Sequence, residues 1–152
     1  DNSNFKDEKW YINTNQSFAF TDGVVTASYG TATPKAHADT LFTAQNETDG
    51  LGTEGEVATR GLKYNLIQTL KSQVANELAR TDWYITRNSE KSTAIPSSIS
   101  NHRDAVRTKQ AAMEAQITGA SDTAALEILY TYTEQEDGSV TRPLGELPVL
   151  EL

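Results

Sequence analysis

The chain has 152 residues and a net charge of −8 at pH 7, from 21 acidic and 13 basic side chains. This length suits one domain, or one domain with an appendage, better than two full domains. The acidic balance disfavours nucleic acid as a partner, because phosphate backbones bind basic surfaces. Hydrophobic residues make up 37% of the chain, which predicts a thin core. Cysteine is absent, which excludes disulfides, a thiol nucleophile and cysteine metal sites.

No stretch approaches the roughly 20 apolar residues of a membrane span, so no membrane partner is expected. Charge is unevenly distributed along the chain. Residues 1–59 carry nine acids and three bases, residues 60–110 four acids and nine bases, and residues 111–152 eight acids and one base. A basic middle between acidic flanks predicts that this segment either folds back on the flanks or presents a positive face to an acidic neighbour. Solvated faces with chance clustering are the alternative.

The clearest β signal is a hairpin near the N-terminus. Gln16–Thr21 and Val24–Tyr29 are β-prone runs that flank Asp22-Gly23, a strong hairpin turn signal. Alternation along the first strand places Phe18 and Phe20 on one face. Because an isolated hairpin is marginal in water, we expect this ribbon to pack on the helices or on another chain.

Two weaker signals surround the hairpin. Trp10–Ile12 predicts a short additional strand before it. Residues 30–52 are rich in threonine and alanine and show no clear period. This segment therefore predicts a loop with one short element at Leu41-Phe42.

Helical periodicity begins after residue 52. Thr53–Glu56 fits a capping box and predicts the start of the first helix. Apolar residues then recur every four positions, which predicts one buried helix face: Leu62, Leu66, Leu70, Val74 and Leu78. The polar segment Arg87–Thr93 predicts a loop after this helix.

A second long helix is predicted to start near Pro96, where a proline costs little, and to end at Gly119. One of its faces carries Ile99, His102, Val106, Met113 and Ile117. Ser121 is expected to cap a short third helix. Residues 128–133 fit either helix or strand, and the two prolines of residues 142–148 predict an extended arm.

The sequence therefore predicts an α+β protein, with an N-terminal β-hairpin or small sheet, a helical hairpin with a short third helix, and an extended C-terminal arm. The expected boundaries are 1–52 for the β-rich module, 53–131 for the helices, and 132–152 for the acidic turn and arm. The apolar residues of the arm either anchor in a neighbouring chain or close this protein's own core.

Residues able to support catalysis are sparse, and we predict no catalytic residue, no cofactor and no metal site. His37 and His102 are the only histidines, and His102 lies on an apolar stripe, which favours a hydrogen-bonded structural role. Asn46–Gly50 resembles the start of a calcium loop, but its glycine comes one place early, so a turn explains it. The carboxylates of Glu134–Asp137 fit a solvated loop tip. The chain is not expected to be an enzyme.

Trp83 follows the first long helix directly. The favoured interpretation is an indole that covers the open end of the helical hairpin; an exposed contact residue is the alternative.

Three short patterns resemble sequences of tailed bacteriophages. The run Leu78–Arg87 contains Thr81-Asp82-Trp83-Tyr84, Ile95-Pro96 follows, and the next helix carries Arg103 and Arg107 four residues apart. This order resembles a "T-D-W-Y/T-x-x-R … I-P … R-x-x-x-R" pattern of small virion or tail proteins from marine and cyanobacterial phages. A looser form occurs in tail-fibre assembly chaperones. The ending, residues 141–148, is also similar, and the resemblance covers roughly residues 62–148.

The resemblance implies a bacteriophage structural protein of the tail, baseplate or fibre region that resides in the virion and acts by protein–protein docking. The expected partners are other phage structural proteins and further copies of the chain, as a homo-oligomer. The alternatives are a tail-fibre assembly chaperone absent from the mature particle, and a head decoration or head-fibre protein. The candidate interaction residues are Arg80, Trp83, Arg87, Arg103, Arg107, Leu144, Leu147 and Leu150.

Overall fold

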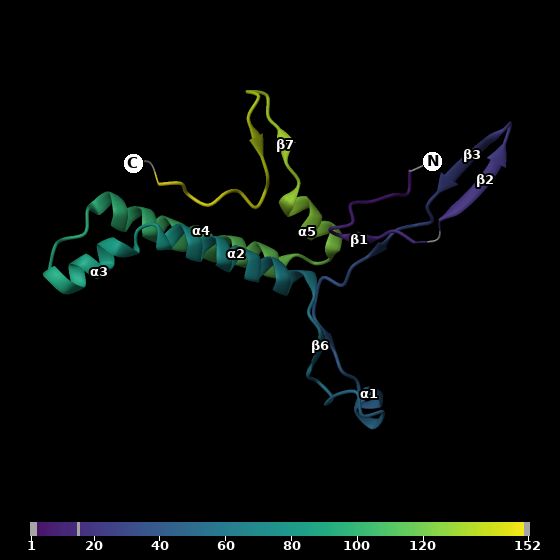
Figure 1. Ribbon diagram of the computed structural model, residues 1–152, viewed down its shortest axis with the longest axis horizontal. Helices are drawn as coiled ribbons and strands as arrows, with labels where there is room; N and C mark the ends of the chain where they lie inside the picture. Colours follow the sequence, from purple (N-terminus) through teal and green to yellow (C-terminus); the bar gives the residue numbers. More distant parts are fainter. Residues whose placement is uncertain (1–2, 15, 151–152) are drawn as a thin grey trace. The chain divides into compact units, whose positions relative to one another are not determined.

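The computed structural model describes residues 3–14 and 16–150 (Figure 1). Small antiparallel strand pairs are followed by helices, which confirms the predicted α+β class. The strands are β1 (Tyr11–Ile12), β2 (Ser17–Thr21), β3 (Val24–Ser28), β4 (Thr33–Pro34), β5 (Thr40–Leu41), β6 (Val57–Thr59), β7 (Thr133–Glu134) and β8 (Val140–Thr141). The helices are α1 (Ala44–Thr48), α2 (Leu62–Ala79), α3 (Asp82–Lys91), α4 (Ser97–Gly119) and α5 (Thr123–Tyr130).

The chain divides into two compact units. The first unit contains residues 1–62 and 121–127, and the second contains residues 63–120 and 128–152. This division differs from the three segments expected from the sequence. Residues 53–62 belong with the N-terminal strands, and the C-terminal arm belongs with the long helices.

The predicted hairpin is confirmed as β2 paired with β3. Phe18 lies opposite Ala27 and Phe20 lies opposite Val25 in an antiparallel register. Asp22 and its following glycine have φ angles of 51° and 80°. Two consecutive positive φ values match the twist of a two-residue hairpin turn, which explains why Asp-Gly forms it.

The other strands of the first unit pair across loops. β1 pairs with β4 and does not extend the hairpin, and β5 pairs with β6. The core of this unit contains Trp10, Tyr11, Ala32, Thr123 and Leu126. The Tyr11 hydroxyl donates to Glu127 at 2.9 Å. This bond and the burial of the ring raise the pKa of Tyr11 above 10.0.

The first long helix begins at Leu62, so the predicted start at Thr53 is wrong. The Thr53–Glu56 segment instead turns back on β5, because Gly55 has a φ of 83° and its N–H donates to the Phe42 carbonyl oxygen. The Asp39 carboxylate accepts from the Gly61 N–H at 2.8 Å. That bond, followed by the Arg60 guanidinium, lowers the pKa of Asp39.

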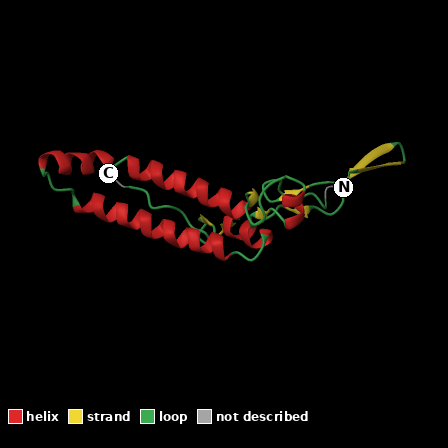
Figure 2. Ribbon diagram, turned by 90° about the horizontal axis from the view of Figure 1, so that it is seen from below, coloured by secondary structure: helices red, strands yellow, loops and turns green. Residues whose placement is uncertain are grey.

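In the second unit, α2 and α4 form an antiparallel helical hairpin, and the two helices lie side by side in both views (Figures 1 and 2). Lys63 near the start of α2 donates to the Thr118 carbonyl near the end of α4 at 2.8 Å. Of the predicted α2 stripe, Leu70 and Val74 are buried, whereas Leu62, Leu66 and Leu78 are half-buried. All five predicted residues of α4 are buried. No helix in the described residues is long and apolar enough to span a membrane.

Two further helix boundaries differ from those predicted. The polar segment after Thr86 continues α3 as far as Lys91 and is not a loop. The helix ends at Ser92, which has a φ of 52° and donates its N–H to the Asn88 carbonyl. α5 is capped by Asp122 and not by Ser121, because the Asp122 carboxylate accepts from the Ala125 N–H at 2.8 Å.

Candidate interaction surfaces

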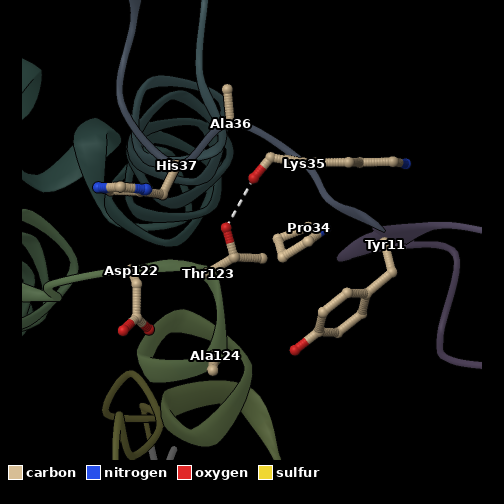
Figure 3. Close-up of a pocket in the computed structure, with 8 residues that line it drawn as sticks. All are labelled: Tyr11, Pro34, Lys35, Ala36, His37, Asp122, Thr123 and Ala124. Carbon is tan, nitrogen blue, oxygen red and sulfur yellow. Dashed lines mark hydrogen bonds between the residues drawn. The ribbon is translucent and has the colours of Figure 1, made fainter. Parts of the chain in front are cut away.

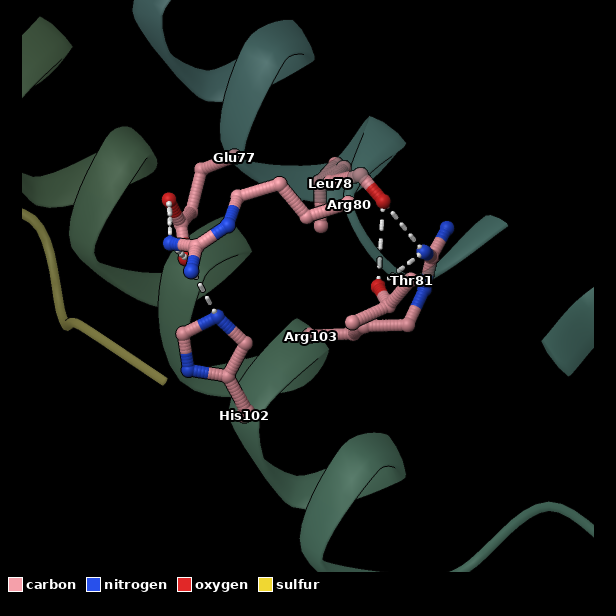
Figure 4. A network of polar contacts seen from close by, with 6 residues as sticks. All are labelled: Glu77, Leu78, Arg80, Thr81, His102 and Arg103. Carbon is pink, nitrogen blue, oxygen red and sulfur yellow. Dashed lines mark hydrogen bonds and ion pairs between the residues drawn. The ribbon is translucent and has the colours of Figure 1, made fainter. Parts of the chain in front are cut away.

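A buried arginine joins the end of α2, the start of α3 and the start of α4 (Figure 4). Arg103 Nη1 donates to the Leu78 carbonyl at 2.8 Å, to Thr81 Oγ1 at 2.7 Å and to Asp82 Oδ1 at 2.9 Å. Arg103 is 8% exposed and Thr81 is 1% exposed. These charge-assisted bonds fix the direction in which α3 leaves the helical hairpin.

A second polar group lies beside this arginine. The Glu77 carboxylate accepts from Arg80 at 3.0 Å and lies 3.1 Å from His102 Nε2. Burial of the Glu77 carboxyl opposes its ionisation, but the bonds and charges of Arg80 and His102 outweigh burial and lower its pKa. His102 is thus a hydrogen-bonded residue of the helix interface, as the apolar stripe predicted.

The α3 helix presents an aromatic and cationic surface, here called the Trp83 face and made of Trp83, Tyr84 and Arg87. The two rings lie 4.0 Å apart between centroids, and the Arg87 guanidinium carbon lies 5.7 Å from the Trp83 ring. No residue of α3, all of which are described, is buried. Trp83 is 52% exposed, so the favoured interpretation that its indole closes the core is wrong.

Three other candidate arginines bond to partners within residues 77–107. Arg80 pairs with Glu77 and Arg107 pairs with Asp104 at 3.3 Å, each three residues away, and both arginines are about half exposed. Arg103 is buried and its Nη1 makes three hydrogen bonds within the chain, so its role is internal. The structure therefore brings Trp83 and Arg87 together and places Arg107 apart from them as an exposed ion pair on α4.

The C-terminal arm packs on its own unit at Leu144. This side chain is 1% exposed, its N–H donates to the Leu129 carbonyl at 3.1 Å, and its carbonyl accepts from Lys109 at 3.0 Å. Leu144 therefore closes the core of this chain, which was one of the two alternatives for the arm. Leu147 and Leu150 are half-buried, and Val149 is 75% exposed.

The β2–β3 hairpin is the most exposed apolar element of the first unit. Phe18 is 69% exposed, Phe20 is 73% exposed and Val25 is 64% exposed. The register places the two phenylalanines and Val25 on one face, here called the ribbon face. The sequence showed this face, and the structure adds that nothing in the described residues buries it.

A cavity of about 450 Å³ lies in the first unit between β4 and the start of α5 (Figure 3). Its lining is mostly apolar, and it includes one histidine, His37, and one carboxylate, Asp122. The Thr123 hydroxyl at its edge donates to the Lys35 carbonyl at 2.6 Å. That bond joins α5 to the residue after β4. No sequence pattern indicated this cavity, because its residues come from distant segments.

Groups for metal or acid–base chemistry are not assembled in the described residues. No cluster of three or more histidine or acidic side chains there is arranged to hold a metal ion. The Asn46–Gly50 segment is the end of α1 and a turn with Gly50 at a φ of 72°. Glu134, Glu136 and Asp137 are exposed at the β7–β8 turn.

Comparison of this chain with models of protein families, with curated proteins and with solved structures gave no match.

Proposed function

We propose that this chain is a structural protein of a bacteriophage virion, in the tail, baseplate or fibre region, and that it acts by docking to other proteins. The observation that carries this proposal is the Trp83 face. No side chain of the helix that bears it is fully buried, and an isolated ten-residue helix is unstable in water. Such a helix is supported at one end by Arg103 and offers its aromatic residues to a partner.

The phage-like pattern of the sequence supports the same proposal. Some of its residues contact each other inside the fold, and others form an exposed surface. Thr81 and Asp82 accept hydrogen bonds from Arg103, so the first and last parts of the pattern are joined in the folded chain. Trp83 and Arg87 lie outside this network and form the exposed surface. Tryptophan, tyrosine and arginine are the residue types that contribute most to binding at protein interfaces.

The location is tested on purified particles of the phage that encodes the chain. We expect quantitative mass spectrometry to find the chain in the mature particle at a fixed number of copies. Its absence from particles, together with its presence in infected cells, would overturn the structural role and favour the assembly chaperone.

The docking surface is tested with Trp83→Ala and Arg87→Glu. Both changes lie on an exposed face, so we expect the urea unfolding midpoint to stay within error of wild type while incorporation into particles falls. Tyr64→Ala is the matched control, because Tyr64 is also an exposed aromatic residue on a helix of the second unit. Equal incorporation of all three variants would exclude the Trp83 face as the docking surface.

A further inference from the structure

We propose that the Trp83 face of one copy of the chain docks into the cavity between β4 and α5 of a second copy. This inference rests on the proposed docking function and deepens it by naming the partner, which is the chain itself. It does not depend on a location in the virion.

The indole of Trp83 is the part of the Trp83 face that most needs a cover. Trp83 is 52% exposed, and its ring contacts that of Tyr84 on one side. Tryptophan offers a large apolar area, and such a residue contributes most to binding when it fills a pocket on the partner. A partner for this face therefore needs an apolar cavity large enough for an indole ring.

The cavity between β4 and α5 meets this requirement. Its volume is about 450 Å³, and an apolar cavity of about 150 Å³ already accommodates a benzene ring. Pro34, Ala36 and Ala124 supply apolar parts of its wall (Figure 3). The bond from the Thr123 hydroxyl to the Lys35 carbonyl joins two sides of the wall, so the cavity is formed before anything binds.

The cavity has a negative potential. Asp122 lines it with an exposed carboxylate at the start of α5. The pKa of Tyr11, another lining residue, is raised by its bond to Glu127 and by burial, and further by the negative charges of Glu127 and Asp122. Both carboxylates thus act on the same wall of the cavity.

Arg87 supplies the matching positive charge. Its guanidinium carbon lies 5.7 Å from the centre of the Trp83 ring, so an indole that enters the cavity brings a cation to its rim. Lys35 is the one lysine or arginine among the described lining residues. Its ammonium group donates to the Glu8 carbonyl oxygen at 2.5 Å, and its side chain points away from Asp122 (Figure 3). The Asp122 carboxylate therefore remains available to the arginine of a partner.

The charge of the two units favours a second copy as the partner. The first unit carries 11 acidic and four basic residues, whereas residues 63–120 of the second unit carry five acidic and eight basic residues. Two copies therefore attract each other when the long helices of one approach the first unit of the other. Two first units repel each other. Charge thus favours a heterologous contact, which joins two different surfaces of the chain.

Two substitutions remove the two sides of this contact. Trp83→Ala removes the indole, and Ala124→Leu fills the cavity from an exposed position of α5. Each should weaken self-association by about tenfold or more in sedimentation velocity experiments over a range of concentrations. Tyr64→Ala and Ala44→Leu are the matched controls, at an exposed aromatic residue of α2 and an exposed alanine of α1, and should leave self-association unchanged. Urea unfolding midpoints within error of wild type show that all four variants fold.

Mixing the two variants tests the heterologous contact directly. The Trp83→Ala chain keeps an open cavity and the Ala124→Leu chain keeps its indole. An equimolar mixture should therefore form a 1:1 dimer, although neither variant associates alone. A mixture that stays monomeric under conditions where wild type associates would overturn the proposal.

Arg87 tests the contribution of charge. Arg87→Gln should weaken self-association by about fivefold or less, because an exposed ion pair is worth little, and high salt should reduce this difference. Glu90→Gln removes an exposed carboxylate from α3 and should strengthen self-association slightly. A larger loss from Arg87→Gln than from Trp83→Ala would contradict the indole as the anchor of the contact.

Failure of this inference can be distinguished from failure of the proposed function. A wild-type chain that stays monomeric at every concentration would exclude docking to a second copy. If Trp83→Ala is then still lost from particles, the Trp83 face binds a different protein. Self-association that depends on Trp83, together with normal incorporation of Trp83→Ala, would instead support the contact between copies and exclude its role in the particle.

Discussion

Replacing Arg103 with methionine should lower the free energy of unfolding by about 3 kcal/mol. Methionine keeps much of the aliphatic stem but removes the donors to the Leu78 carbonyl and to Thr81. Hydrogen bonds to charged groups contribute about 1.5–3 kcal/mol each, and two of them at the lower value give the estimate. The lower value applies because the Thr81 hydroxyl still donates to the Leu78 carbonyl, at 3.0 Å.

Asp82, the third acceptor of Arg103, adds little to the loss in the free energy of unfolding. The Asp82 side chain is 61% exposed, so water solvates its carboxylate once the guanidinium is gone. Asp82→Asn should therefore cost less than about 1 kcal/mol, whereas Thr81→Val, at a buried hydroxyl, should cost about 1–2 kcal/mol. Because Arg103 and Thr81 share a bond, the double variant should show a coupling energy of about 0.5–3 kcal/mol.

Urea unfolding followed by far-ultraviolet circular dichroism measures these differences. Arg107→Met is the matched control: Arg107 lies one turn further along α4, is 52% exposed and pairs with Asp104. Its loss should change the free energy of unfolding by less than about 0.5 kcal/mol. If Arg103→Met costs no more than Arg107→Met, the buried arginine does not hold α3 and the argument for the Trp83 face loses its support.

Two further changes test the second unit. The pKa of Glu77 is lower in the folded chain than its ordinary value of 4.5, so its contribution to stability is present above about pH 4.5 and is lost as the pH falls through the folded pKa. Glu77→Gln should therefore destabilise the chain at neutral pH and much less in acid; a pH-independent difference in urea unfolding would contradict this. Leu144→Ala should cost about 2–5 kcal/mol, because its side chain is 1% exposed. Val149→Ala, at a side chain 75% exposed, should be near neutral, and equal costs would show that the arm is not docked.

The elements that could be predicted from the sequence are those with a local cause. Asp22-Gly23 specifies the turn through two positive φ angles, and the register of β2 and β3 follows from it. The apolar stripe of α4 predicted its buried face, and that of α2 did so at Leu70 and Val74, because burial at a helix interface requires that spacing.

The elements that could not be predicted depend on contacts between distant residues. The segment after Thr86 has no apolar stripe, and α3 is oriented by an arginine more than 20 residues further along the chain. The Thr53–Glu56 segment carries a correct capping pattern, yet pairing with Phe42 across the β5–β6 turn determines its conformation. The indole of Trp83 was predicted to cover the end of the helical hairpin. In the structure Arg103 and Thr81 occupy that end, where they hydrogen-bond to each other.

The basic middle segment was expected either to fold back on the acidic flanks or to offer a positive face to an acidic neighbour. Arg80, Arg103 and Arg107 each pair with a carboxylate inside that segment, and Arg60 at its start pairs with Asp39 of the N-terminal acidic flank. Three of the nine basic side chains of the segment are thus balanced locally, on α2, α3 and α4. The Trp83 face and the ribbon face both expose large aromatic side chains, and the Trp83 face is the surface that we propose for a partner. Docking through it should depend on apolar contact more than on charge, which is consistent with a chain that is itself strongly acidic.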